Sequence, residues 1–125
     1  MGEYHFDDGE ILAELPQYDS NVRYYVSNYG RVFSLCGKDY WIIKTPQHDE
    51  KGYLYVDLYC KGDKTRKRIH QLVVEAFMPY TDLDDIEIHH LDGNKDNNHL
   101  DNLIPLTSEQ HRMIHKYTRK WREIV

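Results

Sequence analysis

Histidines gather in the last third of the chain at spacings that suit metal-assisted chemistry. Of the eight histidines, His89 and His90 are adjacent, and His111 and His115 are four residues apart. Adjacent residues on a strand point to opposite faces, whereas residues four apart on a helix face the same way. One histidine of a strand pair could therefore join a helix pair around a metal while the other faces a substrate.

Such a centre fits the hydrolysis of a phosphodiester bond. The reaction requires a water deprotonated near neutral pH, and a histidine with a pKa of about 6.5 suits that task. It also requires neutralisation of charge on the leaving oxygen, which a divalent metal in contact with the scissile phosphate can supply. The arrangement of the histidines therefore meets the chemical needs of metal-assisted phosphodiester hydrolysis.

The segments around these histidines predict a strand–loop–strand–helix unit. Residues 86–90 and 103–106 have the composition of short strands, and residues 91–98 form a polar loop between them. A helix is expected from Ser108, with Thr107 as its N-cap and Gln110 completing a capping box. A ββα unit is thus predicted at the C-terminal end.

The preceding residues predict a small sheet module. Strands are expected at 22–26 and 31–35 around a turn at 27–30, then at 40–43 and 53–60, followed by a basic return arm and a short helix from Gln71 that Pro79 ends. We expect an α+β chain with an extended lead-in at 1–20, a sheet module with its connecting strand and helix at 21–80, and the ββα unit at 81–125.

The ββα unit resembles the signature of HNH homing endonucleases. The similar segments run from Ile88 to Asn98, over Asp101–Leu103, and from Leu106 to His111. The resemblance implies a ββα-metal (His-Me finger) fold that cuts DNA. It further implies that His90 is the general base, that Asn102 ties the loop together, and that His89 and His111 bind metal. His115 matches a second helix histidine of some related nucleases, as a further ligand or phosphate contact.

The resemblance continues upstream. Residues 25–35 are similar to the NUMOD4-type module that often precedes such HNH units in phage and intron-borne nucleases, and residues 68–77 resemble the segment that joins the two. Together the similar segments cover roughly residues 21–116 in the order of the family.

The motif residues differ from those of many homing relatives, which carry Asp-His or Asn-His and an asparagine at the third position. Here the set is His89, His90 and His111. Nitrogen ligands favour softer ions. One divalent ion is expected, Mg²⁺ or Mn²⁺, with Zn²⁺ and Ni²⁺ also open.

The net charge of −5 argues against a general nucleic-acid coat, but basic side chains cluster in two places. DNA phosphates are the expected partner of both clusters, although solvation alone would also explain them. The candidate DNA-binding residues are Arg66, Lys67, Arg68, Arg112, Lys116 and Arg119.

The two cysteines, Cys36 and Cys60, have no metal-ligand spacing, which favours a reducing, cytoplasmic setting. The family resemblance implies a bacterial or phage-encoded protein. The N-terminus is acidic where a signal peptide would be basic. No segment approaches the roughly 20 apolar residues of a membrane span, so no membrane partner is expected.

Two other functions remain open from the sequence: a DNA-binding module without catalysis, and a structural zinc protein with a closed four-ligand site. Whether one or two strands are cut and whether the chain dimerises are also open, although a monomer with one centre favours nicking. We further expect His70 to be a hydrogen-bonded packing histidine, and Asp92 and Asp96 to shape the loop rather than bind metal.

Overall fold

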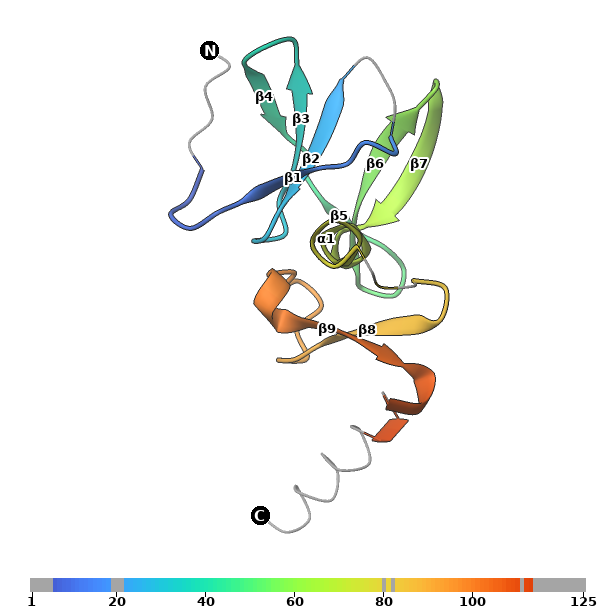
Figure 1. The fold of residues 1–125 in the computed structure, drawn as a ribbon. Helices are drawn as coiled ribbons and strands as arrows, with labels where there is room; N and C mark the ends of the chain where they lie inside the picture. Colours follow the sequence, from blue (N-terminus) through green and yellow to red (C-terminus); the bar gives the residue numbers. More distant parts are fainter. Residues whose placement is uncertain (1–5, 19–21, 80, 82, 111, 114–125) are drawn as a thin grey trace.

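The computed structural model describes residues 6–18, 22–79, 81, 83–110 and 112–113 (Figure 1). Alternating apolar residues build a four-stranded antiparallel sheet in the order β1-β2-β3-β4. Its strands are β1 (Leu12–Glu14), β2 (Arg23–Ser27), β3 (Val32–Cys36) and β4 (Tyr40–Ile43). The turn between β2 and β3 occupies the predicted residues 27–30, and Gly30 has the positive φ of 80° that such a turn needs.

A second sheet leads directly into the helix α1 (Ile69–Phe77). It consists of β5 (Gln47–His48), β6 (Leu54–Cys60) and β7 (Asp63–Arg68), with β6 in the centre. The helix begins two residues before the predicted start, so His70 lies in its first turn. The helix ends where expected, just ahead of Pro79, because proline cannot continue it.

The third sheet is the predicted β-pair of the ββα unit. β8 (Ile86–His90) pairs antiparallel with β9 (Leu103–Thr107), and the short 3-10 helix η1 (Leu100–Asn102) precedes β9. After β9 a helix starts at Ser108, and the capping box is present. The Thr107 backbone N–H donates to Gln110 Oε1 at 3.0 Å, and the Gln110 N–H donates to Thr107 Oγ1 at 3.2 Å.

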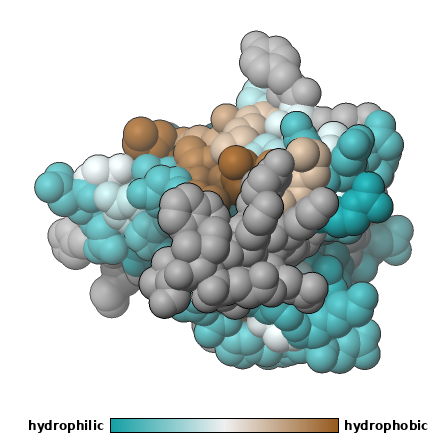
Figure 2. All heavy atoms as spheres, turned by 90° about the horizontal axis from the view of Figure 1, so that it is seen from below, coloured by the Kyte–Doolittle hydropathy of each residue, from teal (hydrophilic) through white to brown (hydrophobic). Residues whose placement is uncertain are grey.

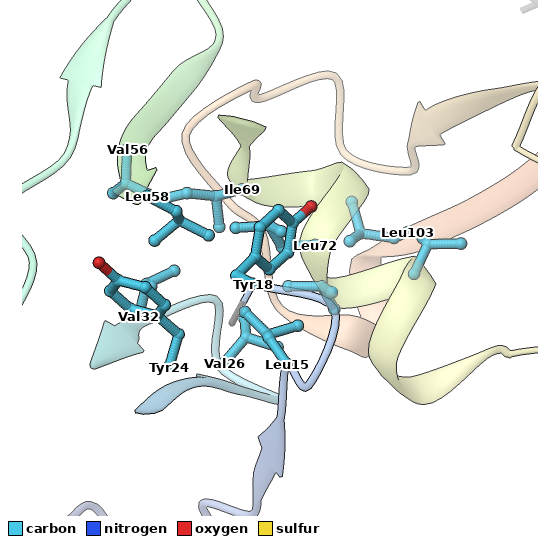
Figure 3. Packing of buried hydrophobic residues seen from close by; sticks show 12 residues of the cluster. Leu15, Tyr18, Tyr24, Val26, Val32, Val56, Leu58, Ile69, Leu72 and Leu103 are labelled. Atoms are coloured by element: carbon cyan, nitrogen blue, oxygen red, sulfur yellow. The ribbon is translucent and has the colours of Figure 1, made fainter. Parts of the chain in front are cut away.

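α1 connects the three sheets. In Figure 1 it lies in the middle, with the two larger sheets above it and β8–β9 below it. Its buried side chains Ile69, Leu72, Val73 and Val74 pack in one cluster with residues of β2, β3, β6 and β9 (Figure 3). Each buried aliphatic side chain stabilises the fold by roughly 1.5–3 kcal/mol. The N-terminal module and the ββα unit therefore share one core.

The predicted α+β class, with a small antiparallel module ahead of a ββα unit, is confirmed. The segment expected as a lead-in takes a larger part in the fold than its sequence suggested. β1 pairs with β2, and Leu15 and Tyr18 belong to the core cluster.

In the parts of the chain that the structure describes, no helix has the length and apolarity required to cross a bilayer.

Candidate active site

His90 lies at the end of β8, enclosed by three polar or aromatic neighbours. Its side chain is only 6% exposed, whereas His89 is half-buried, as the alternation of a strand requires. The His90 ring centroid lies 5.2 Å from that of His70 and 6.1 Å from that of Tyr53. His90 Nε2 lies 2.8 Å from Asn98 Oδ1.

The contact with Asn98 determines which nitrogen of His90 carries the proton. An amide oxygen can only accept a hydrogen bond, so Nε2 must donate and therefore bears the hydrogen. In a neutral imidazole the other nitrogen, Nδ1, then keeps its lone pair. This tautomer is the form in which a histidine can accept a proton from water.

Asn102 joins the two ends of the loop between β8 and β9. Its buried amide Nδ2 donates to Asp92 Oδ1 at 2.9 Å and to the Asn97 carbonyl at 2.8 Å, while Oδ1 accepts from the Asp92 N–H at 3.1 Å. The backbone of Leu91 also donates to the Asn102 carbonyl at 2.8 Å. These bonds hold residues 91–97 against the start of β9.

Asp92 is occupied by the loop itself. Besides Asn102, its carboxylate accepts from the Asn97 side chain and from the Asn94 N–H, each at 2.8 Å. The Asn97 side chain, followed by the Asn94 backbone and Asn102, lowers the pKa of Asp92 to about 2. Asp96 faces His48 Nε2 at 2.8 Å. Asp92 thus shapes the loop, as expected, whereas the Asp96 side chain links the loop to β5.

His70 differs from its prediction as a hydrogen-bonded histidine. It is 5% exposed, and its Nδ1 has no hydrogen-bond partner among the residues with a described placement. The ring instead packs between Tyr53, at 4.9 Å, and His90. Burial, together with the nearby charges of His90 and Arg68, lowers the pKa of His70 from 6.5 to about 4.

This pKa predicts an acid-sensitive fold. The unfolded chain binds the His70 proton below pH 6.5, but the folded chain does so only below about pH 4. Above pH 6.5, neutral His70 does not oppose folding. As the pH falls from 6.5 to 4, the free energy of unfolding should decrease by on the order of 3 kcal/mol, because only the unfolded chain binds the proton.

Urea unfolding at pH 7, 5.5 and 4 measures this effect. The His70→Gln variant should lose the corresponding part of the pH dependence, whereas His48→Gln, at an exposed histidine, should keep it. An equal dependence in wild type and His70→Gln would contradict the assignment.

The candidate DNA-binding residues of β7 are held by aromatic rings. Arg66 stacks over Tyr55 at 3.8 Å and Arg68 over Tyr53 at 4.5 Å, while Lys67 lies 5.8 Å from the Tyr18 ring. Arg68 also donates to Asp49 at 2.8 Å.

A polar pocket of about 330 Å³ adjoins the site, lined by Tyr53, Arg68, His70, Gln71, Leu83 and the β8 residues Ile86, Glu87 and Ile88.

The other candidate residues follow β9 in the sequence, and of these the structure describes only Arg112. Arg112 is exposed at the start of the helix that follows β9. His111, His115, Lys116 and Arg119 lie outside the described residues. Figure 2 shows the molecule from below, and among the described residues on this face hydrophilic side chains predominate, with hydrophobic ones gathered in one area.

Most of the expected metal ligands lie outside the residues that the structure describes. Within the described ranges, no three histidine, cysteine or acidic side chains gather where they could hold an ion. His89 is the only expected ligand with a described position, so the proposed set requires a contribution from the helix that begins at Ser108.

Sequence reasoning missed Asn98 and Tyr53, which both face His90. Asn98 lies within the loop segment that resembles the family, and Tyr53 lies in the strand expected at 53–60, whose tyrosines Tyr53, Tyr55 and Tyr59 could line DNA; neither pattern predicts a contact with His90. Lys95 was also missed, and its Nζ lies 4.7 Å from the Tyr53 ring. The spacing along the chain gives no signal for these contacts because they connect separate segments.

Comparisons with known proteins agree with this geometry. Residues 67–113 match the HNH endonuclease family, and residues 10–59 match the NUMOD4 motif. The H-N-H endonuclease F-TflII of Escherichia phage T5 is 31% identical over 105 residues, which cover 83% of this chain and 50% of the phage protein. An uncharacterized HNH endonuclease of Acanthamoeba polyphaga mimivirus is also 31% identical, over 81% of this chain and 29% of its own length.

A solved structure of the HNH homing endonuclease I-HmuI, described with its DNA binding and cleavage, is similar throughout. It superimposes with a TM-score of 0.66 at 25% identity, covering 92% of this chain and 60% of that one. The chain thus spans half or less of the two sequence relatives and about three-fifths of I-HmuI. From these matches, residues 67–113 are similar to the HNH endonuclease family, and residues 10–59 ahead of them are similar to the NUMOD4 motif.

Proposed function

We propose that the chain is a metal-dependent DNA endonuclease of the HNH type that hydrolyses phosphodiester bonds. The observation that carries this proposal is the hydrogen bond between His90 Nε2 and Asn98 Oδ1, within a loop that Asn102 closes. It leaves Nδ1 of His90 as the basic nitrogen that takes a proton from the attacking water. The likeness to I-HmuI supports DNA as the substrate.

In this proposal the basic residues hold the DNA backbone. Arg66, Lys67 and Arg68 contact phosphates from the side of β7, and Arg112, Lys116 and Arg119 do so from the C-terminal part of the chain. A monomer contains one such centre, so we propose that it nicks one strand. The relative from Escherichia phage T5 favours a bacterial or phage-infected cytoplasm as its setting.

We assign one divalent ion to His89 and His111, with His115 as a further candidate ligand. When bound, the ion would neutralise charge at the leaving 3′ oxygen. Mg²⁺ or Mn²⁺ is proposed, and the nitrogen ligands also leave Zn²⁺ and Ni²⁺ as candidates.

Plasmid cleavage tests the proposal. The purified chain should convert supercoiled plasmid to the open-circular form in at least one of Mg²⁺, Mn²⁺, Zn²⁺ and Ni²⁺. EDTA should stop the conversion, and excess metal should restore it.

The same preparation separates the alternatives. A DNA-binding module would shift plasmid in a gel without cutting it in any of the four ions. A structural zinc protein would lose its folded circular dichroism signal in EDTA, because closed zinc sites supply folding free energy. Either result would contradict a catalytic metal site.

A further inference from the structure

A turn of the N-terminal module rests on three consecutive residues of the HNH loop. The Leu100 N–H donates to the Asn28 carbonyl at 2.8 Å. The Tyr29 ring stacks on His99 with centroids 4.8 Å apart. A Cβ atom built on Gly30 would lie only 2.8 Å from Asn98 Cβ and from the Asn98 carbonyl oxygen. The β2–β3 turn, residues 27–30, is thus in direct contact with residues 98–100.

This turn is held in place from the other side. The buried Ser27 Oγ accepts from the Tyr29 and Arg31 N–H groups at 3.1 and 3.2 Å. The Asn28 side chain accepts from the Ile11 N–H at 2.7 Å and donates to the Gly9 carbonyl at 3.2 Å. The β2–β3 turn is therefore a fixed support for whatever packs on it.

Asn98 is the residue that connects this support to His90. Its side chain is 3% exposed, and Oδ1 accepts from His90 Nε2 at 2.8 Å. Its buried Nδ2 has no hydrogen-bond partner in the part of the chain that the structure describes. A buried unpaired amide group destabilises a fold. An asparagine at this position is therefore explained by the acceptor that it offers to His90.

We propose that Asn98 is a positioning residue for His90, and that the β2–β3 turn holds Asn98 in place. The inference rests on the proposed function, in which His90 is the base. It makes the NUMOD4 region a structural part of the catalytic centre. Asn98 fixes the ring orientation and the tautomer, because the hydrogen bond at one ring nitrogen determines the state of the other.

The first test removes the acceptor. Asn98→Ala should lower the single-turnover nicking rate by about 10–100-fold, the usual effect of losing an orienting partner. Plasmid binding in EDTA should stay within about twofold, since binding rests on phosphate contacts. Asn98→Asp keeps an oxygen at the acceptor position and should retain more activity than Asn98→Ala. Asn94→Ala, at an exposed asparagine of the same loop, is the matched control and should cut like wild type.

The second test changes the contact between the β2–β3 turn and Asn98 by substituting Gly30. Gly30 and Gly37 both have positive φ, 80° and 69°, but a Cβ at Gly37 meets nothing within 4 Å. Gly37→Ala therefore reproduces the backbone strain without the contact and should nick at the wild-type rate. Gly30→Ala should fall toward the rate of Asn98→Ala while still binding plasmid.

A spectroscopic readout separates positioning from general damage. In wild type, ¹⁵N shifts should show the His90 proton on Nε2, and this preference should weaken in Asn98→Ala and Gly30→Ala. The inference is overturned if both variants nick at the wild-type rate, or if both keep the wild-type tautomer, while His90→Ala is inactive. That pattern would leave the proposed function intact, whereas wild-type nicking by His90→Ala would overturn both.

Discussion

Replacing His90 by alanine is expected to slow DNA nicking by about 10²–10⁴-fold, the usual contribution of a general base. His90 is enclosed at the end of β8, and its Nε2 is bound to Asn98, which leaves Nδ1 as the nitrogen that takes the proton. DNA binding should change by no more than about twofold because a buried ring adds little to phosphate contacts.

The measurement is a single-turnover plasmid assay at saturating protein, with binding followed separately by gel shift in EDTA. His48→Ala is a matched control, since His48 is an exposed histidine on β5 that pairs with Asp96. It should nick like wild type. Equal rates for wild type and His90→Ala would exclude His90 as the base.

Replacing Asn102 by alanine is expected to lower the free energy of unfolding by about 2–3 kcal/mol. The substitution removes three side-chain hydrogen bonds, one of which satisfies the Asn97 carbonyl. A typical internal hydrogen bond contributes about 1 kcal/mol, and a buried group left unpaired adds to the loss. For a chain of this size the melting temperature should fall by roughly 10 °C.

Urea and thermal unfolding of Asn102→Ala measure this loss. Asn94→Ala serves as the control, because Asn94 is exposed and its side chain accepts only from the Asp96 N–H in the same loop. The control should stay within about 0.5 kcal/mol of wild type. A similar loss in both variants would show that Asn102 does not close the loop.

Local patterns were sufficient to predict most of the elements. β8 and β9 follow from apolar residues at strand spacing, and the helix start follows from Thr107 and Gln110, which form the capping box. Gly30 marked the β2–β3 turn because it can adopt positive φ. Each of these signals acts within a few residues of the chain, which is why the sequence alone reveals it.

Contacts between distant segments could not be predicted in this way. Nothing in the residues around Asn98 indicates that a turn about 70 residues earlier packs against it. The role of Leu15 was hidden because Pro16 interrupts the pattern of its segment. His70 reads as a polar residue near a helix start, and only the packing of Tyr53 and His90 shows it to be buried.

The central claim is that the His90 imidazole supplies the base for DNA cleavage, and chemical rescue tests it most directly. The His90→Gly variant should be nearly inactive in the plasmid assay, and added imidazole should restore nicking in proportion to its concentration. Imidazole should leave the wild-type rate unchanged. Nicking by His90→Gly at the wild-type rate without imidazole would contradict the claim.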